Sequence, residues 1–418
     1  MSREFPTSTG TSTPPLMSSQ QQAREFNVSA VLGMFWNTPA GVGLTASELV
    51  GMTGLTRATI LSICDELREQ GWVTEDRAPS AIPGRGRQAR RFTFNQRRYL
   101  IAAADVGFHS VTSAISDLKG TILGQAQVSL VDHQWQADRT QHLLDTFEQA
   151  LREANVEHNE IEMGCIGVAA PVTYEGEPYP GQPFWELMRI DQERLRSFAP
   201  RWRIIIENDA NLAALAEQEV RVGKLRSPMV TLLAGERLGA GVIVNGELLK
   251  GFHGGAGEMG HLEYFQKTEG SLGFVGSARR LVHEALRKNH NSLLREIPDE
   301  DLEHLALEDI FDAADSGDIL ARDVLTKISD HIALAISTAT YLIDPSLVII
   351  AGGAAAQVAP LLPRLEAKLS ELTPLPPAIE TSTLGRDVVL LGAIHNAIRQ
   401  VRAATLTRHL HTPTTMSA

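Results

Sequence analysis

The feature that most constrains the fold is the stretch LTASELVGMTGLTRATILSICDELREQGW, residues 44–72. Thr45 and Glu48 have the spacing of a capping box, so a helix is expected to begin just after Thr45. Gly54 supplies a turn, and Thr56 is a residue type that caps a second helix. Two short helices joined by a turn that contains glycine predict a helix-turn-helix unit.

The second helix of this unit has one apolar and one polar face. Ile60, Ile63 and Leu67 recur at helical spacing, and Gly71 fits the position just past the helix end. In a helix-turn-helix, the first turns of the second helix enter the major groove of DNA. The residues expected to contact DNA from this helix are Thr56, Arg57, Thr59 and Ser62. The alternative is a plain helical hairpin whose polar face is merely solvated.

An arginine-rich segment follows the two helices. Residues 72–98 read as strand, loop and strand, and residues 83–98 hold six arginines and no acid. Such a hairpin is typical of a wing that lies along the phosphate backbone or inserts into the minor groove. The wing residues expected to contact DNA are Arg85, Arg87, Arg90 and Arg91. A solvated basic loop is the alternative, and the preceding helices favour a winged helix-turn-helix.

Length and charge divide the chain into parts. With 418 residues, two or three domains are expected. The formal net charge is −12. Residues 24–99 hold ten Lys or Arg against seven Asp or Glu, a charge of +3, residues 1–23 are neutral, and the remainder carries −15. This asymmetry indicates one part that meets polyanions and one that does not.

Several classes of protein are disfavoured by simpler patterns. No apolar run approaches the ~20 residues of a membrane helix, and the N-terminus has no secretory pattern. Cys64 and Cys165 sit in apolar contexts and suggest no disulfide framework, so a cytoplasmic protein is expected. Residues 1–23 and 405–418 are predicted to be disordered tails because of their Ser, Thr, Pro and Gln content.

The body alternates strand-like and helix-like segments. Residues 100–130 read as two strands joined by a turn at residues 117–120. Asn245-Gly246 marks the turn of a further hairpin. Further strands are expected in EMGCIGVAAPV, WRIIIENDAN, MVTLLAG and SLVIIAGGAA, and helices in residues 210–222 and 330–342. This order predicts an α/β body of two lobes with a cleft between them.

Several residue groups of the body resemble the ROK family, which comprises bacterial sugar kinases and winged-helix repressors. IENDANLAALAE, residues 206–217, is similar to the family's Glu-Asn-Asp-Ala-Asn signature, and residues 254–261 resemble its Gly-Glu-x-Gly-His segment. Residues 105–120 fall at its first phosphate loop and residues 351–355 at its adenosine-side glycines. The resemblance runs from about residue 26 to about 402 and implies a winged helix-turn-helix joined to a sugar-kinase-like fold of the actin type.

The resemblance implies a set of ligand-binding residues. The positions that match the family's sugar-binding groups are Asn208, Asp209, Glu258 and His261. Carboxylates and amides suit vicinal hydroxyls, and the aspartate at the position of Asp209 is the general base in kinase members. The alternative is a polar network that braces the lobes, and for His261 a structural role weighs almost as heavily. Trp185 is expected either to line the cleft or to pack.

The phosphate loops depart from the family pattern. Where kinases have Asp-x-Gly-Gly-Thr, this chain has Asp105, Gly107, Phe108 and His109. Where they have Gly-Thr-Gly, it has Gly235, Glu236 and Arg237. A carboxylate beside a triphosphate is repelled by a few kcal/mol at intermediate dielectric. Arg237 either offsets this repulsion of the phosphates or pairs with Glu236 instead. Because phosphoryl transfer depends on positioning and charge, we expect no nucleotide cofactor and no enzyme activity.

The family's zinc site is also altered. Ser271, Gly273 and Ala278 stand at its three cysteine positions, so no structural zinc is expected. Arg280 replaces a glutamate that contacts sugar in the family, and this inversion of charge leaves open an acidic ligand or no ligand at all.

The sequence therefore predicts a DNA-binding transcriptional regulator of repressor type. Its domains are expected at 24–99 for the winged helix-turn-helix, 100–207 with 385–404 for the first lobe, and 208–384 for the second. The expected partners are a double-stranded, palindromic operator, a sugar or sugar-phosphate effector and a second copy of the chain, with no membrane. Two alternatives remain: a sugar kinase with an added DNA-binding module, and a ligand-blind regulator whose body only dimerises or docks proteins.

Overall fold

The structure is a computed structural model, and it falls into two compact units. One comprises residues up to 98 together with those from 400 onward, and the other comprises residues 99–399. The last helix, α14 (Val388–His411), contributes residues to both units. The residues that the structure describes are 19–77, 89–130, 138–180, 183–221, 228–234, 237–259, 273–288, 291–298, 302 and 305–411.

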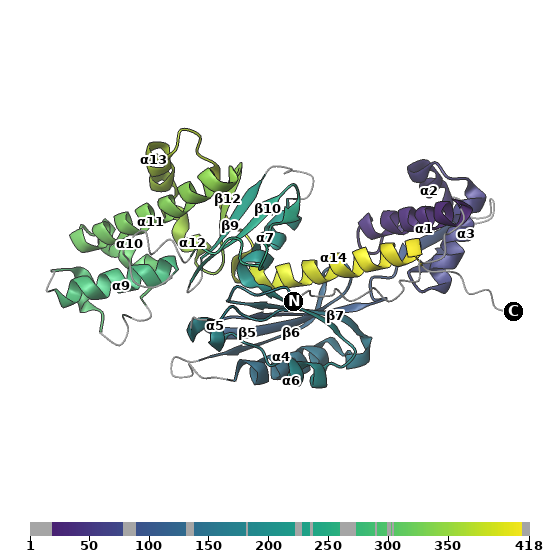
Figure 1. Ribbon diagram of the computed structural model, residues 1–418, viewed down its shortest axis with the longest axis horizontal. Coiled ribbons are helices and arrows are strands. Elements are labelled where there is room, and N and C mark those ends of the chain that lie inside the picture. The colour runs from purple at the N-terminus through teal and green to yellow at the C-terminus, as the bar shows by residue number, and fades with distance from the viewer. Residues whose placement is uncertain are drawn as a thin grey trace, which may run out of the picture. The chain divides into compact units, whose positions relative to one another are not determined.

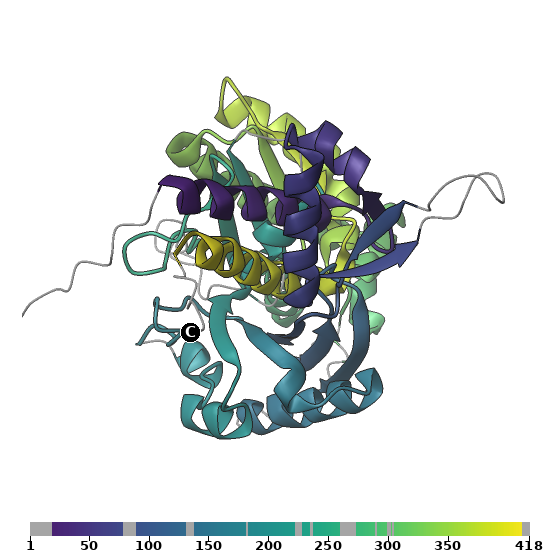
Figure 2. The ribbon, with the colours of Figure 1, turned by 90° about the vertical axis from the view of Figure 1, so that its right-hand side faces the viewer.

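The first unit packs three helices against a small antiparallel sheet. Its helices are α1 (Ser19–Asn37), α2 (Ala46–Thr53) and α3 (Arg57–Glu69), and its strands are β1 (Gly43–Thr45), β2 (Val73–Arg77) and β3 (Arg90–Phe94). The sheet order is β1-β3-β2, and α1 packs against α2 and α3 (Figures 1 and 2). Trp36, Trp72 and Phe94 form a buried aromatic cluster, with ring centroids 5.1–6.4 Å apart.

Short-range signals of the helix-turn-helix are confirmed. Thr45 accepts from the backbone of Glu48, the Glu48 carboxylate accepts from the backbone of Thr45, and α2 begins at the next residue. Gly54 ends α2 in the left-handed region at φ 72°, and Thr56 caps α3 by accepting from the backbone of Thr59. Gly71 follows α3 at φ 80°, the geometry that glycine adopts without strain.

Both predicted tails are partly helical, which corrects the prediction of disorder. Helix α1 already begins at Ser19, inside the predicted tail 1–23, and α14 continues to His411, inside the predicted tail 405–418. Glutamine and alanine are good helix formers, and the glutamines at the start of α1 extend a helix whose buried residues Val31 and Phe35 lie further on. Composition alone predicts disorder here because it does not consider that a helix packed further along the chain can continue into a polar segment.

The second unit is built on two five-stranded sheets of the same topology. The first comprises β4 (Leu100–Val106), β5 (Ser110–Ser116), β6 (Ile122–Ser129), β7 (Ile161–Val168) and β8 (Arg203–Asn208). The second comprises β9 (Met229–Ala234), β10 (Leu238–Val244), β11 (Glu247–Leu248), β12 (Leu347–Ala351) and β13 (Ala378–Thr381). The orders β6-β5-β4-β7-β8 and β11-β10-β9-β12-β13 are the same when each sheet is numbered from its first strand. In both, the first three strands pair antiparallel and the last two are parallel additions.

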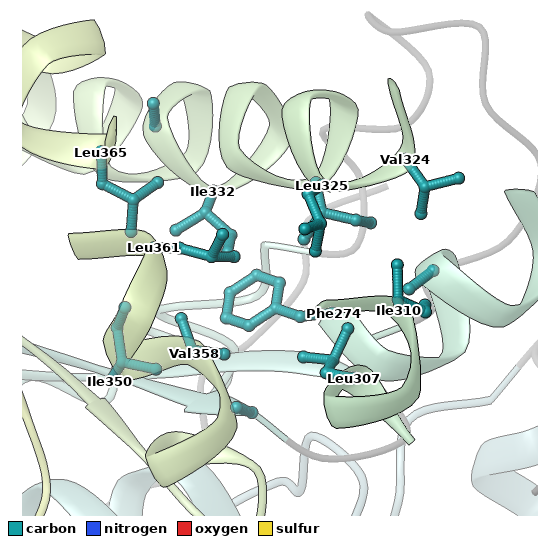
Figure 3. Packing of buried hydrophobic residues seen from close by; sticks show 14 of the residues in the cluster. Phe274, Leu307, Ile310, Val324, Leu325, Ile332, Ile350, Val358, Leu361 and Leu365 are labelled. Carbon is teal, nitrogen blue, oxygen red and sulfur yellow. The ribbon is translucent and has the colours of Figure 1, made fainter. Parts of the chain in front are cut away.

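Helices cover these sheets and extend the second half. They are α4 (Arg139–Ala154), α5 (Pro183–Leu187), α6 (Gln192–Phe198), α7 (Asp209–Glu219), α9 (Phe274–Arg287), α10 (Leu307–Asp315), α11 (Ile319–Ile343), α12 (Ala355–Val358) and α13 (Leu362–Leu372). Helix α4 packs on β5 and β6, and α7 packs on β9 and β10 (Figure 1). Figure 3 shows Phe274 of α9 pointing into the apolar core between α10, α11 and α12.

The α/β body of two lobes is confirmed, with differences in detail. The segment predicted as two strands forms three, because residues 107–109 close a tight turn between β4 and β5. Strand β13 was not predicted, and α11 is longer than the predicted residues 330–342. The hairpin at Asn245-Gly246 is confirmed, with φ of 55° and 81° at these two residues.

Among the described residues, no helix combines the length and the apolar character that crossing a membrane requires.

Candidate functional site

The predicted DNA-contacting face of α3 is exposed. Arg57 and Ser62 are exposed, whereas Thr59 is half-buried. The Thr56 hydroxyl is used in capping and lies 2.9 Å from the Thr59 hydroxyl, and Arg57 donates to the Ser47 hydroxyl at 2.9 Å. Arg57 and Ser62 are thus the two predicted residues of this helix whose side chains face solvent without serving the helix cap.

The wing is a hairpin of β2 and β3, in register from Val73↔Phe94 to Arg77↔Arg90. Its connection, with Arg85 and Arg87, lies outside the described residues. Arg90 was predicted to contact DNA, but its guanidinium binds Asp65 of α3 and donates from Nε to Glu75 of β2 at 2.6 Å. Arg91, also predicted as a DNA contact, donates to the Gly43 carbonyl at 2.6 Å. Both side chains therefore bind protein groups at the base of the wing.

The ion-pair network of Arg90 joins the wing to α3. Arg68 of α3 donates to the same Glu75 carboxylate at 2.6 Å. The hydrogen bonds from Arg90 lower the pKa of Glu75 to about 2, and those to Asp65 also lower the pKa of that carboxyl. The network is charge-assisted and holds the hairpin at a defined angle to the helix.

A cavity of about 380 Å³ lies between the two halves of the second unit. The three segments assigned to the family's nucleotide side reach it: Gly107 and Phe108 in the β4–β5 turn, Arg237 before β10, and Gly352 and Gly353 after β12. The predicted ligand-binding residues Asn208, Asp209 and Glu258 line the same cavity. Cavities of this volume are typical of small-molecule sites, and this one combines apolar walls with several charged and polar side chains.

Asn208 and Asp209 lie where β8 ends and α7 begins. The Asn208 amide donates to the Ala170 carbonyl at 3.0 Å, and its oxygen accepts from the backbone of Asn211 at 3.1 Å, capping α7. Asn208 therefore both braces the lobe and faces the cavity. The preceding Glu207 is buried, and its carboxylate is 2.6 Å from the Lys250 ammonium group.

Three carboxyl groups share the cavity, and all have raised pKa values. Burial raises the pKa of Asp105 to about 7, with a further contribution from the charge of Asp387. Burial, followed by the charge of Asp105, raises the pKa of Asp209 to about 8. Burial raises the pKa of Glu258 to about 7, and the charge of Arg237 partly offsets it. Near neutral pH such groups both donate and accept hydrogen bonds, which suits the hydroxyls of a sugar.

The loop that carries Glu258 depends on two glycines. Gly254 and Gly257 have φ of 94° and 90°, and a Cβ at either would overlap a backbone carbonyl, that of Val172 or of Ala240. This close packing sets the loop against residues 172–179, where the buried hydroxyl of Tyr179 lies beside Gly255. The nearby charge of Glu258 contributes, after burial, to a raised pKa of Tyr179.

Some predicted features lie outside the described residues or away from the cavity. His261, Glu236 and Ser271 lie outside, so their roles stay predictions. Ala278 is buried in α9, and the described residues contain no metal-binding cluster. Arg280 does not line the described cavity: its guanidinium donates to Glu284 one turn along α9. Among the described residues, the charge of Arg280 is therefore met by Glu284 on its own helix and does not reach the cavity.

Four cavity residues were not foreseen as a group. Trp185 of α5 both lines the cavity and packs, with 9% of its surface exposed, so the two alternatives for it are both met. Phe184 beside it carries Arg237 over its ring at 4.6 Å, and Arg386 lines the cavity near Gly353. The aromatic pair in QPFWEL was the one sequence signal available for this wall.

This architecture defines a class, the two-lobed sugar-kinase-like α/β proteins, here with an added unit of helices and a small antiparallel sheet. The sequence pattern of the ROK family matches residues 101–398. The chain belongs to the ROK family.

Both regulators and kinases are among its relatives. It is 23% identical over 339 residues to the DNA-binding transcriptional dual regulator NagC of Escherichia coli, covering 76% of this chain and 79% of NagC. It is 30% identical over 211 residues to a glucokinase of Thermotoga maritima, covering 46% of this chain and 64% of that enzyme. The crystal structure of a ROK family transcriptional regulator, a homolog of the E. coli MLC protein, has a TM-score of 0.69 at 21% identity, covering 93% of this chain and 99% of that one. The regulators match over more of the chain, and at 93% coverage the match to the regulator structure includes most of the first unit.

Proposed function

We propose that the chain is a DNA-binding transcriptional regulator of repressor type whose body senses a sugar or sugar derivative. The observation that carries this proposal is the first unit: a capped helix-turn-helix with Arg57 and Ser62 exposed on α3, joined to a wing. The charge asymmetry supports it, since this unit is basic and the remainder acidic. The similarity to NagC agrees with it, as does the similarity to the structure of a ROK regulator, which covers 93% of the chain and so extends over the first unit.

The cavity supports a small polyhydroxyl ligand. Asp209 and Glu258 come from different segments and face one space beside the Asn208 amide. As a mechanism, ligand binding shifts the equilibrium between two arrangements of the lobes and thereby the affinity for the operator. Such a shift requires that the ligand bind the two arrangements with different affinity.

We propose that the chain acts as a homodimer on a palindromic site, since one recognition helix reads one half-site. Residues 331–343 of α11 contain no Asp, Glu, Lys or Arg, yet Leu334, Tyr341 and Leu342 on this stretch are 39%, 67% and 76% exposed. Large apolar side chains that gather on one exposed, uncharged stretch are typical of interaction surfaces, so this face fits a second copy. Leu342→Asp is expected to shift the sedimentation coefficient to that of the monomer, whereas Asp323→Lys on the charged half of α11 should not.

The function is tested by fluorescence anisotropy with DNA from upstream of the protein's own gene, at several salt concentrations. Tight, salt-sensitive binding that a sugar or sugar phosphate weakens would support the proposal and identify the ligand class. Asp209→Ala should abolish the ligand effect while DNA binding persists. Binding that no compound alters would favour a ligand-blind regulator, and an unchanged ligand effect in Asp209→Ala would contradict the pocket assignment.

A kinase is the second candidate, because Asp105 and Asp209 both line the cavity and the glucokinase relative is similar. We propose that the chain has no kinase activity, since Phe108 and Arg237 stand in place of small phosphate-loop residues. ADP release with ATP and a panel of hexoses separates the two functions. Hexose-dependent ADP release that Asp209→Ala abolishes would establish the kinase instead.

A further inference from the structure

Four side chains form a continuous series of ring contacts, and three of them, Phe108, Phe184 and Arg237, line the cavity. The Arg139 guanidinium lies 5.8 Å from the centroid of the Phe108 ring, that ring is 5.6 Å from Phe184, and the Arg237 guanidinium lies 4.6 Å from Phe184 on the cavity wall. We call Arg139, Phe108, Phe184 and Arg237 the stack. Its two rings are tilted by 31°, and their centroid separation lies within the range of favourable aromatic pairs.

The stack joins the two halves of the unit. Phe108, Arg139 and Phe184 belong to the half built on β4–β8, because Phe108 and Phe184 pack against the core of that sheet. Arg237 belongs to the other half, since it directly precedes β10. The contact between Arg237 and Phe184 therefore crosses the cleft.

The first three members of the stack are held in place by contacts that do not involve Arg237. Arg139 is 3% exposed and donates to the Phe108 carbonyl at 3.3 Å and to the Leu187 carbonyl at the end of α5 at 3.5 Å. One buried guanidinium thus fastens both the β4–β5 turn and α5. Phe184 is presented to Arg237 on a short helix anchored at its far end.

The stack occupies the segments that the family resemblance assigns to phosphate binding. Phe108 lies in the first such segment and Arg237 ends the second, and both line the cavity. Phosphate loops need close backbone approach, which these side chains and their mutual contacts remove. The same contacts supply an attraction across the cleft, where desolvated cation–π pairs are strongest.

We propose that the stack is a latch with two effects. It holds the two halves of the cleft together when no nucleotide is bound, and it excludes nucleotide phosphates from the cavity. Phe184 and Arg237 close it, Phe108 fills the phosphate position, and Arg139 is a positioning residue. The proposal rests on the family's cleft and needs neither DNA nor a known sugar, so its failure is distinguishable from failure of the regulator function.

The latch is tested in the full chain by hydrogen–deuterium exchange. Phe184→Leu and Arg237→Met should each speed exchange in residues 183–188 about tenfold, and the double variant should add little, since either change alone removes the contact. Phe184→Tyr keeps the ring and should exchange as the unaltered protein does. No change in these residues, or effects of the two single variants that add fully, would overturn the latch.

Two controls separate the latch from general packing. Arg386→Met removes another cavity arginine that lies outside the stack, and Phe198→Leu removes a ring that packs on Phe147 and Trp202 in the same half. Neither should change exchange in residues 183–188 as Arg237→Met does. Equal effects from Arg386→Met would attribute the change to loss of cavity charge and contradict the proposal.

Nucleotide exclusion has its own measurement, binding of a fluorescent N-methylanthraniloyl ATP with magnesium. The unaltered chain should show no saturable binding up to millimolar concentration. In a chain that carries Glu236→Thr, which removes the repelling carboxylate, adding Phe108→Gly and Arg237→Gly should tighten binding at least tenfold relative to Glu236→Thr alone, because the two side chains that fill the phosphate segments are gone. Comparable binding by these two variants would overturn the assignment of specificity to the stack.

Discussion

Replacing Arg90 by methionine separates two roles for a wing arginine, contact with DNA and bracing of the hairpin. Methionine keeps much of the stem but removes the guanidinium that binds Asp65 and Glu75. The pKa of Glu75 falls from 4.5 to about 2 in the folded protein. At 1.36 kcal/mol per pKa unit, the interactions of this carboxylate contribute at most about 3 kcal/mol to the free energy of unfolding. Because the Glu75 side chain is 24% exposed and Arg68 also binds it, about 1 kcal/mol is the expected loss.

The assay is hydrogen–deuterium exchange of β2 and β3 in the full chain. At pH 7 the loss of about 1 kcal/mol should speed exchange in these strands roughly fivefold. Since the pKa of Glu75 is lower in the folded state, its contribution is fully present above about pH 4.5 and is lost as the pH falls toward 2. The difference between Arg90→Met and the unaltered chain should therefore shrink over that range. Arg97→Met, an exposed arginine after β3, is the matched control.

DNA binding provides the second readout. A brace changes affinity but not the number of phosphates contacted, so the slope of log affinity against log salt should stay the same in Arg90→Met. Loss of a phosphate contact would instead reduce that slope by about 0.9. A reduced slope together with unchanged exchange in β2 and β3 would refute the bracing role and return Arg90 to the DNA-contacting set.

Three further predictions concern other positions. Arg57→Met should weaken DNA binding, with a salt slope reduced by about 0.9 if the contact is to phosphate, and an unchanged affinity would remove α3 from the interface. Gly257→Ala should lower the melting temperature by several degrees because its Cβ overlaps a β10 carbonyl, whereas Gly33→Ala, in an open helical position, should stabilise by about 0.5–1 kcal/mol. Lys250→Met leaves a buried carboxylate without its ion-pair partner and should cost about 3 kcal/mol by calorimetry, while Lys327→Met on the surface of α11 should be nearly neutral.

What the sequence predicts well are features decided within a few residues. The capping box of Thr45 and Glu48 and the turn at Asn245-Gly246 depend on neighbours in the chain, and both are found as expected. The apolar face of α3 is similarly local, since Ile60 and Ile63 share a face by helical geometry alone. These local signals, repeated along the chain, were enough for the fold class.

What the sequence did not predict depends on residues far apart in the chain. Arg90 reads as a free wing cation until the fold places Asp65, 25 residues away, beside it. The sequence offers Glu236 as a partner for Arg237, whereas the structure places its guanidinium over the ring of Phe184, more than 50 residues earlier. Side chains choose partners across the fold, so a charge count predicts a basic wing but not which arginines remain available.

Asn208 and Asp209 are adjacent, yet their effects on stability are opposite. Asn208 caps α7 and donates to the Ala170 carbonyl, so Asn208→Ala should cost about 1–2 kcal/mol at any pH near neutrality. Asp209 has a pKa raised from 3.8 to about 8, mainly by burial and then by the charge of Asp105. Between these two pH values the folded state binds a proton that the unfolded state has released, so its stability falls as the pH rises.

Asp209→Asn removes this penalty while keeping an oxygen that can accept from the backbone of Ala210. Calorimetry should find the variant a few degrees more stable than the unaltered chain at pH 8 and nearly equal at pH 4. Within the described residues neither Asp209 nor Glu258 forms an ion pair that would reward its burial, and groups that destabilise a fold are retained most readily where they bind ligand. If Asp209→Asn were less stable than the unaltered chain at pH 8, the carboxylate would stabilise the contact between the lobes. Its burial would then no longer support a ligand-binding role for the cavity.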